Sequence, residues 1–379
     1  MIVVTNRLPD PPIGGIPRFL SELALAAQNL FDHVSFLIPN RTEALVGERP
    51  QTKIESILAG LPALRDVPLS NTEVRRSVES VGARLIDYKI TTRTSPQPVV
   101  VAPSLVAFTD DRFCERASAA LRHAHQVGKS STLLLLAPIE ELDFYLGGEL
   151  VRDLVGRISS VGRHASCLAA PSLHSASGWQ QRLALPVTRL PLGIGPSAVA
   201  DQPRQRHRHR YISCERPGPF AMHKNTWLLE RVYSLLSADA PVEMVIVGGH
   251  KSNSDRMLAT PPELADKELQ HLFETSRAFL SLSAFESFGF AGLEAMRGGA
   301  IPIVRSGTGL TETVSDIGIA LDADNDLALC EQAADAVLAV INENDSSFEE
   351  MSRRARERAT RLSGVRMYRS LAGLPTETQ

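Results

Sequence analysis

The chain has 379 residues, of which 43 % are hydrophobic and 22 % are charged, a composition typical of globular rather than disordered proteins. Lys and Arg total 40 against 43 Asp and Glu, and this near-balance argues against a dedicated nucleic-acid-binding protein, which is usually strongly basic. The four cysteines lie far apart and form no CxxC pair, which argues against a zinc module or a disulfide framework. At roughly 150 residues per domain, the length predicts two or three domains.

Short apolar runs alternate with longer amphipathic stretches along most of the chain. An amphipathic helix is predicted over 19–30, and the first series of predicted strands covers residues 2–4, 34–38, 99–102, 133–136, 167–170 and 187–190. The second series covers residues 211–213, 242–247, 278–283, 301–304 and 318–321. Short runs that are apolar on both faces are typical of buried parallel strands, so the alternation predicts two doubly wound α/β domains.

A segment rich in Pro and Gly, residues 193–203, separates the two series and predicts a linker. Arginines alternate directly after it, at Arg204, Arg206, Arg208 and Arg210. The favoured interpretation is a solvated face of the linker or first strand, and the alternative is a contact with a polyanion or an anionic membrane. Near the C-terminus a helix is predicted over 348–371, with Glu–Arg pairs at 349/353 and 350/354.

The most informative segment is 281–304. A strand is predicted to end near Ser283, and a helix to begin at Ser287, so Glu286 precedes the helix and Glu294 lies about two turns into it. The free N–H groups and the positive dipole at a helix start favour an anionic or hydroxyl-rich ligand, and a carboxylate beside them can accept sugar hydroxyls. The alternative is that Glu286 only caps the helix and that Glu294 is exposed.

These residues resemble a known signature. Glu286 and Glu294, together with Ser287-Phe288-Gly289, resemble the E-x7-E motif of retaining GT-B glycosyltransferases, most closely the family 4 group. The following residues, 298–312, resemble the "GxPVI … GGxxE" continuation of that family. Further segments resemble family motifs in the same order along the chain: Gly14-Gly15, residues 191–195, Lys224-Asn225, Gly248-Gly249 and residues 363–371.

The resemblance implies the GT-B architecture, in which two Rossmann-like doubly wound parallel-sheet domains face a central cleft. It places the acceptor-side domain at 1–197, joined by a C-terminal helix over about 361–379, and the nucleotide-sugar domain at 198–360. The implied activity is transfer of a hexose, with retention, from a UDP-, GDP- or ADP-linked donor to a hydroxyl acceptor. That acceptor is a glycan, a lipid-linked saccharide or a small molecule. The donor is a co-substrate, and neither a cofactor nor a metal ion is expected.

The resemblance also assigns roles to single residues. Glu286 contacts the donor-sugar hydroxyls, Glu294 contacts the nucleotide ribose, and Lys224 neutralises the diphosphate leaving group, which makes Glu286 and Lys224 the expected catalytic pair. Fixed positive charge beside a departing phosphate lowers the barrier to transfer. Further donor contacts are expected from Gly15, Arg216, Gly248, Ser287, Phe288 and Gly289.

Two positions depart from the family pattern. The arginine expected five residues before the lysine is replaced by Pro219, and either Arg216 or His223 is a candidate substitute. The histidine expected after the fourth N-terminal strand is also missing. Glu140 or Glu141 is a candidate substitute there, although an exposed loop pair is the favoured interpretation.

Alternative functions remain open at this point. Residues 3–9 followed by Gly14-Gly15 resemble the start of trehalose-phosphate synthases. Because the expected arginine and histidine are missing, a non-catalytic binding protein of the same fold is a further alternative. A sugar-nucleotide epimerase would need acid and base residues that no motif supplies. The longest apolar run, 133–138, is far below the ~20 residues that span a bilayer. A cytoplasmic protein is therefore expected, and a lipid-linked acceptor would bring it to the inner face of the membrane.

Overall fold

A computed structural model describes residues 1–5, 15–30, 32, 35–37, 76, 79–80, 84–85, 97–146, 148–195, 206–214, 219–237, 242–248, 257–261 and 264–375. The chain divides into two compact units. The first comprises residues 1–195 and 364–379, and the second comprises residues 196–363. Most of the predicted linker, like Gly14, Arg204 and Arg216, lies outside the described residues.

The first unit contains a parallel sheet with the strand order β3-β2-β1-β4-β5-β6-β7. Its strands are β1 (Ile2–Val4), β2 (Ser35–Leu37), β3 (Arg84–Leu85), β4 (Val99–Val101), β5 (Ser131–Leu134), β6 (Cys167–Ala170) and β7 (Thr188–Arg189). All six strands predicted for this part of the chain are confirmed. Strand β3 was not predicted because its two residues form no apolar run.

Helices complete the first unit: α1 (Gly15–Asn29), α5 (Asp111–Gln126), α6 (Ile139–Leu146), α7 (Gly148–Gly162), α8 (Leu173–Leu183) and α15 (Gly364–Ala372). Helices α5, α7 and α8 share one buried apolar cluster with alternate residues of β4, β5 and β6, and Trp179 and Phe113 are fully buried in it. The indole of Trp179 also donates to the Ala137 carbonyl at 2.8 Å, which fixes the segment after β5.

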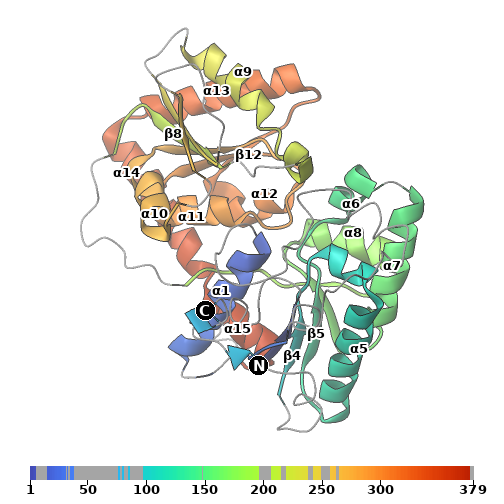
Figure 1. The fold of residues 1–379 in the computed structure, drawn as a ribbon. Coiled ribbons are helices and arrows are strands. Elements are labelled where there is room, and N and C mark those ends of the chain that lie inside the picture. The colour runs from blue at the N-terminus through green and yellow to red at the C-terminus, as the bar shows by residue number, and fades with distance from the viewer. Residues whose placement is uncertain are drawn as a thin grey trace. The chain divides into compact units, whose positions relative to one another are not determined.

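The last helix, α15, packs against α1 in this unit (Figure 1). The Tyr368 hydroxyl donates to the Asp32 carboxylate, and the Gly364 N–H donates to the Ile194 carbonyl at 2.9 Å. The single helix predicted over 348–371 is therefore wrong. The structure has two helices there, α14 (Asp345–Arg361) and α15, because the second one starts where it joins the first unit. The predicted ion pairs are also different, since Arg353 pairs with Glu350 and Glu357.

The second unit contains a six-stranded parallel sheet with the order β10-β9-β8-β11-β12-β13. Its strands are β8 (Arg210–Cys214), β9 (Glu243–Val247), β10 (Met257–Thr260), β11 (Ala278–Ser281), β12 (Ile301–Arg305) and β13 (Ile319–Leu321). The five predicted strands are confirmed. Strand β10 was missed because it lies at the edge of the sheet and Leu258 in it is exposed, so no two-faced apolar run marks it.

Helices cover both faces of this second sheet, with α9 (Trp227–Ser237) and α13 (Asp326–Asn342) side by side on one of them (Figure 1). Helices α10 (Asp266–Thr275), α11 (Phe290–Gly298), α12 (Gly309–Val314) and α14 lie on the other face. This is the doubly wound α/β arrangement predicted for both domains.

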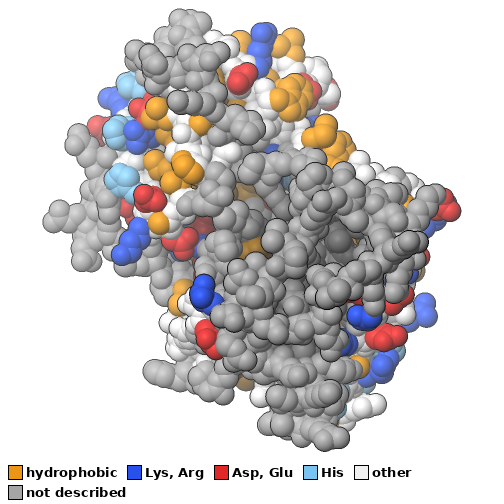
Figure 2. Space-filling view, viewed as in Figure 1, with side chains coloured by type: hydrophobic (Ala, Val, Ile, Leu, Met, Phe, Trp, Pro, Cys, Tyr) orange, Lys and Arg blue, Asp and Glu red, His pale blue; other side chains and the backbone are white. Residues whose placement is uncertain are grey.

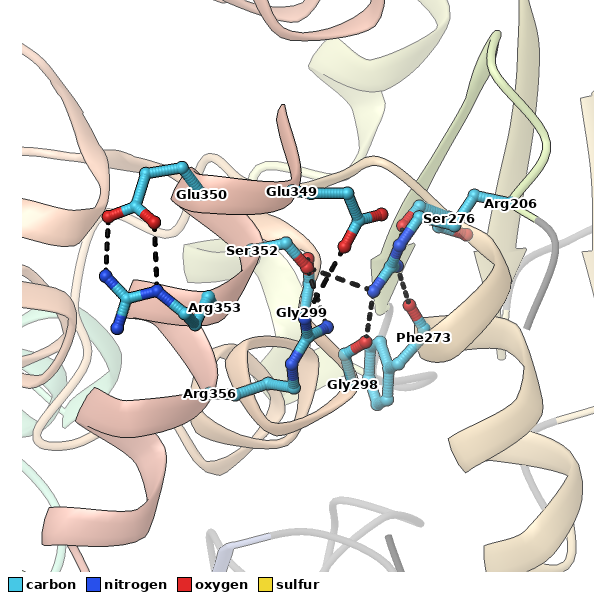
Figure 3. Close-up of polar contacts among 10 residues, drawn as sticks. All are labelled: Arg206, Phe273, Ser276, Gly298, Gly299, Glu349, Glu350, Ser352, Arg353 and Arg356. Atoms are coloured by element: carbon cyan, nitrogen blue, oxygen red, sulfur yellow. Dashed lines mark hydrogen bonds and ion pairs between the residues drawn. The ribbon is translucent and has the colours of Figure 1, made fainter. Parts of the chain in front are cut away.

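Half-buried arginines bind protein atoms at the amino ends of the strands in this unit, and Figure 3 shows the contacts of one of them, Arg206. The Arg206 guanidinium donates to the carbonyls of Ser276 at 2.7 Å and Gly298 at 2.6 Å. Arg210 pairs with Glu243. The interpretation as a solvated face is therefore wrong for these two residues, whereas Arg208 between them is exposed, as that interpretation expects. On the face shown in Figure 2, basic and acidic side chains are interspersed over the described residues. No described helix is long and apolar enough to cross a membrane.

Candidate active site

Strands β8 and β11 are neighbours, but the chain leaves β8 towards β9 on one side and returns to β11 on the other. The connections that follow the two strands therefore diverge. In open α/β sheets such a topological switch point, at the carboxyl ends of the strands, is where ligands bind. The candidate site of the second unit is built from the segments after β8 and β11.

The two predicted catalytic residues meet at this switch point. Lys224 ends the short 3-10 helix η3 (Pro219–Lys224) after β8, and Glu286 follows β11. The Lys224 ammonium donates to the Glu286 carboxylate, although the two residues lie 62 positions apart in the sequence. Each side chain is 19 % exposed. The pair is therefore partly shielded from water yet remains reachable.

Two hydrogen bonds to main-chain carbonyls hold the two segments together. The Asn225 side-chain amide donates to the Leu282 carbonyl at 3.0 Å, and the Ala284 N–H donates to the His223 carbonyl at 2.7 Å. Asn225 itself has a φ of 52°, a left-handed conformation that asparagine tolerates better than most residues. The His223 side chain is buried, and its role as a substitute for the missing arginine stays a prediction. The other candidate, Arg216, lies outside the described residues.

The segment between Glu286 and α11 differs from the prediction. Helix α11 begins at Phe290, so the predicted start at Ser287 is three residues early. Gly289 precedes the helix with a φ of +81°, a backbone conformation that favours glycine. Ser287 and Phe288 are buried, and the Phe288 ring packs on that of Phe290. Residues 287–289 can therefore offer main-chain atoms, but not the Phe288 side chain, to a ligand.

Glu294 lies in α11 and is only 8 % exposed, so the alternative that it is a solvent-exposed residue is wrong. The negative charge of Glu294 changes the pKa of Cys214, the last residue of β8. The pKa of Cys214 is raised to about 12, mainly by burial and in part by the Glu294 carboxylate, while the Lys224 ammonium opposes the rise. The structure thus joins Lys224 and Glu286 after β8, with Glu294 close enough to influence Cys214 at the end of that strand.

Two of the glycines that were expected to contact the donor, Gly248 and Gly15, lie in different units of the chain. Gly248 follows β9 with a φ of +79°, and its N–H donates to the Thr260 carbonyl of β10 at 3.0 Å. That N–H is therefore engaged within the sheet. Gly15 is the first residue of α1 in the other unit.

The first unit has an acidic residue at the equivalent edge of its own sheet. Glu140, in the first turn of α6 after β5, has a carboxylate oxygen 3.6 Å from Nε2 of His174 in α8, and each side chain is 33 % exposed. The interpretation of Glu140 and Glu141 as an exposed loop pair is wrong, because both are half-buried helical residues. No sequence pattern singled out His174, since it reaches Glu140 from the next strand–helix unit.

Within the described ranges, no group of three or more His, Cys, Asp or Glu side chains is placed to hold a metal ion.

No family model and no curated protein matches the sequence. Solved structures match nearly its whole length. A trehalose-phosphate synthase of Burkholderia xenovorans, in complex with glucose-6-phosphate, is 11 % identical with a TM-score of 0.63, over 98 % of this chain and 99 % of that one. Anabaena HepE in complex with UDP-glucose is 13 % identical with a TM-score of 0.62, over 98 % of each chain. The sucrose-phosphate synthase of Thermosynechococcus elongatus is 14 % identical with a TM-score of 0.58, over 98 % and 96 %.

The chain has the GT-B fold. This confirms the predicted fold class of two Rossmann-like domains, and the similar solved structures are GT-B glycosyltransferases. At these identities the likeness establishes the fold, whereas the reaction must be argued from the site.

Proposed function

We propose that this GT-B protein is a retaining glycosyltransferase of the family 4 kind, which transfers a hexose from a nucleotide-sugar donor to a hydroxyl acceptor. The observation that carries the proposal is the Lys224–Glu286 pair at the switch point between β8 and β11. A cation beside a carboxylate suits a donor whose diphosphate is anionic and whose sugar presents hydroxyl groups. The fold supports the same reading, since similar structures include UDP-forming synthases and a UDP-glucose complex.

In this proposal Lys224 contacts the diphosphate and Glu286 accepts hydrogen bonds from the sugar hydroxyls. During transfer, the bond between the anomeric carbon and the phosphate oxygen breaks, and the nucleoside diphosphate leaves with an additional negative charge. The Lys224 ammonium and the amino end of α11 stabilise that charge because they are fixed before the reaction begins. The acceptor oxygen forms the new bond on the same face of the sugar, and its proton passes to the leaving phosphate oxygen.

Glu294 is the candidate partner of the nucleotide ribose, because it is buried in α11 and, like Lys224, acts on the pKa of Cys214 at the end of β8. UDP-glucose is the first donor to test, ahead of GDP- and ADP-linked sugars, and sugar phosphates and free saccharides are the first acceptors. These choices follow the ligands named for the similar structures, UDP-glucose and glucose-6-phosphate. The proposal includes no cofactor or metal ion besides the nucleotide sugar.

The test is a donor screen followed by a transfer assay. Thermal shift with UDP-, GDP- and ADP-glucose should identify one donor that stabilises the protein, by about 2.7 kcal/mol at 100 times its dissociation constant. Release of the matching nucleoside diphosphate is then measured with each acceptor for the wild type, Glu286→Gln and Glu350→Gln. The last variant is the control, because Glu350 pairs with an arginine on the exposed surface of α14.

We expect turnover that Glu286→Gln abolishes and Glu350→Gln leaves intact. Donor binding without turnover would instead indicate a non-catalytic binding protein of this fold. Turnover that Glu286→Gln leaves unchanged would contradict the proposed site.

A further inference from the structure

Helix α12, which follows β12, forms the support of the segment that carries Glu286. The Gly309 N–H, at the start of α12, donates to the Glu286 carbonyl at 2.6 Å. Near its other end, the Thr313 hydroxyl donates to the Phe288 carbonyl at 2.7 Å. Between these two bonds, the Leu310 side chain packs against Gly289. A Cβ added to Gly289 would lie only 2.5 Å from Cδ1 of Leu310. The segment 286–289 is therefore attached to α12 at three successive points.

Thr313 is the only one of these attachments made by a side-chain hydrogen bond. The residue is 3 % exposed, and its hydroxyl also lies 3.2 Å from the Gly309 carbonyl within α12. Because a hydroxyl has one proton, the shorter contact to Phe288 is the stronger one. Without this donor, the Phe288 carbonyl would lose its partner in a buried place, which is unfavourable.

An arginine of α14 holds the C-terminal end of α12 in place. Arg358 of α14 donates to the carbonyls of Thr313 and Glu312, both at 3.0 Å. Helix α12 has only six residues, and a helix this short is not stable without tertiary contacts. The guanidinium satisfies carbonyls at its C-terminal end, where a positive charge is also favoured by the helix dipole.

We propose that Thr313 is a positioning residue: its buried hydroxyl holds the main chain of residues 286–289 so that the Glu286 carboxylate is presented at the site. It acts through the peptide backbone and not by touching a substrate. The kinetic consequence rests on the proposed function, whereas the structural consequence does not. A misplacement of about 1 Å in a catalytic group can cost on the order of 100-fold in rate, so a loss of this anchor should be visible in turnover.

The test uses Thr313→Val, which keeps the shape but removes the hydroxyl, and Thr313→Ser, which keeps the hydroxyl. Thr275→Val is the matched control, because Thr275 is equally buried and donates to a main-chain carbonyl, that of His271 at 2.8 Å, at the opposite edge of the sheet. Three quantities are measured for each variant: site-resolved hydrogen exchange of the Gly309 amide, the dissociation constant of the nucleoside diphosphate, and kcat and KM for transfer.

For Thr313→Val we expect exchange of the Gly309 amide to accelerate about tenfold, because loss of one hydrogen bond loosens the segment that accepts from it. We expect kcat to fall at least about tenfold, and the dissociation constant of the nucleoside diphosphate to stay within about twofold, since Lys224 is not displaced. Thr313→Ser should restore both exchange and kcat, and Thr275→Val should change neither.

Unchanged exchange and unchanged kcat in Thr313→Val would overturn the proposal. Equal impairment of Thr313→Ser and Thr313→Val would also overturn it, because the hydroxyl would then be irrelevant. If the wild type transfers no sugar from any donor, the proposed function fails, and the exchange of the Gly309 amide still decides whether Thr313 holds the segment.

Discussion

The two edges of the sheet in the second unit both gather charged side chains, but they use them differently. At the amino edge, the guanidinium groups are bonded to protein carbonyls: Arg206 to Ser276 and Gly298, and Arg277 to Glu343 at 2.7 Å. Both guanidinium groups also lie over the ring of Phe348, at 5.4 and 4.4 Å from its centre. At the carboxyl edge, by contrast, Lys224 faces a carboxylate and both groups are partly exposed.

The difference shows that charge density alone does not mark a binding site. Burial is the main cause that lowers the pKa of Arg206 to about 10, and the neighbouring Arg356 lowers it as well, whereas Glu349 and Glu274 raise it. The cluster therefore keeps its charge through the carbonyls and carboxylates around it. The amino edge is therefore a structural closure. The Lys224–Glu286 pair can exchange partners with a ligand at little cost, since partly exposed ion pairs are worth little by themselves.

The largest expected effect is at the carboxyl edge. Lys224→Met removes the charge opposite the leaving diphosphate, and we expect kcat/KM for transfer to fall by about 10²–10³. The free energy of unfolding should change by less than about 1 kcal/mol, because the pair is not fully buried. Steady-state kinetics and urea denaturation measure the two quantities. A large loss of stability with unchanged kinetics would reverse the roles assigned to the two edges.

At the amino edge the opposite pattern is expected. Arg206→Met leaves several buried carbonyls without their donor, and we expect a loss of about 3 kcal/mol in the free energy of unfolding. Turnover per folded molecule should stay unchanged. Arg208→Met is the matched control, because Arg208 is exposed in the same segment and should cost less than about 0.5 kcal/mol. Equal denaturation midpoints for the two variants would show that the cluster does not stabilise the unit.

Substitution of two glycines that both have a left-handed backbone conformation distinguishes the cost of backbone strain from the cost of a steric clash. Gly289→Ala places a Cβ against Leu310, whereas a Cβ at Gly307, with a φ of +70°, meets nothing within 4 Å. We expect Gly289→Ala to cost about 2–3 kcal/mol and to lower kcat, and Gly307→Ala to cost about 1 kcal/mol from conformational strain alone. Thermal unfolding and kinetics on both variants check this. Identical costs would mean that the contact with Leu310 is unimportant.

The last effect appears only at alkaline pH and concerns the electrostatics around Cys214. Its folded pKa of about 12 lies above the ordinary value of 9.0, so the stability it contributes is complete below pH 9 and is lost as the pH rises towards 12. The difference in unfolding free energy between the wild type and Cys214→Ala should therefore shrink by about 1.4 kcal/mol per pH unit in that window.

Glu294→Gln removes a charge that raises the pKa of Cys214. In the Glu294→Gln protein, the stability contributed by Cys214 should therefore be lost completely at a lower pH. Urea denaturation between pH 8 and 12 measures both differences. If the difference between wild type and Cys214→Ala does not change with pH, the surroundings of Cys214 do not raise its pKa.

The fold was largely predictable from the sequence because buried parallel strands leave apolar runs such as residues 2–4 and 278–281, which need no tertiary information to be recognised. Glu286, Glu294 and Lys224 were singled out by their resemblance to a motif with fixed order and spacing, and their roles in the reaction stay a prediction. Strand β10 could not be predicted, since an exposed edge strand has no such pattern. Arg206 reads as a surface charge in the sequence, and only the fold shows that it reaches carbonyls about 70 to 90 residues away. Thr313 likewise has a role that only its bond to Phe288 reveals.

The central claim, that ligands bind at the carboxyl edge while the amino edge is structural, is tested most directly by hydrogen–deuterium exchange with and without the stabilising nucleotide sugar. We predict slower exchange in residues 219–230 and 282–294 when the donor is bound. Exchange in residues 270–277 and 345–356, which form the amino edge, should stay the same. Protection confined to the amino edge, or no protection at residues 219–230 and 282–294 at a saturating donor concentration, would contradict the account.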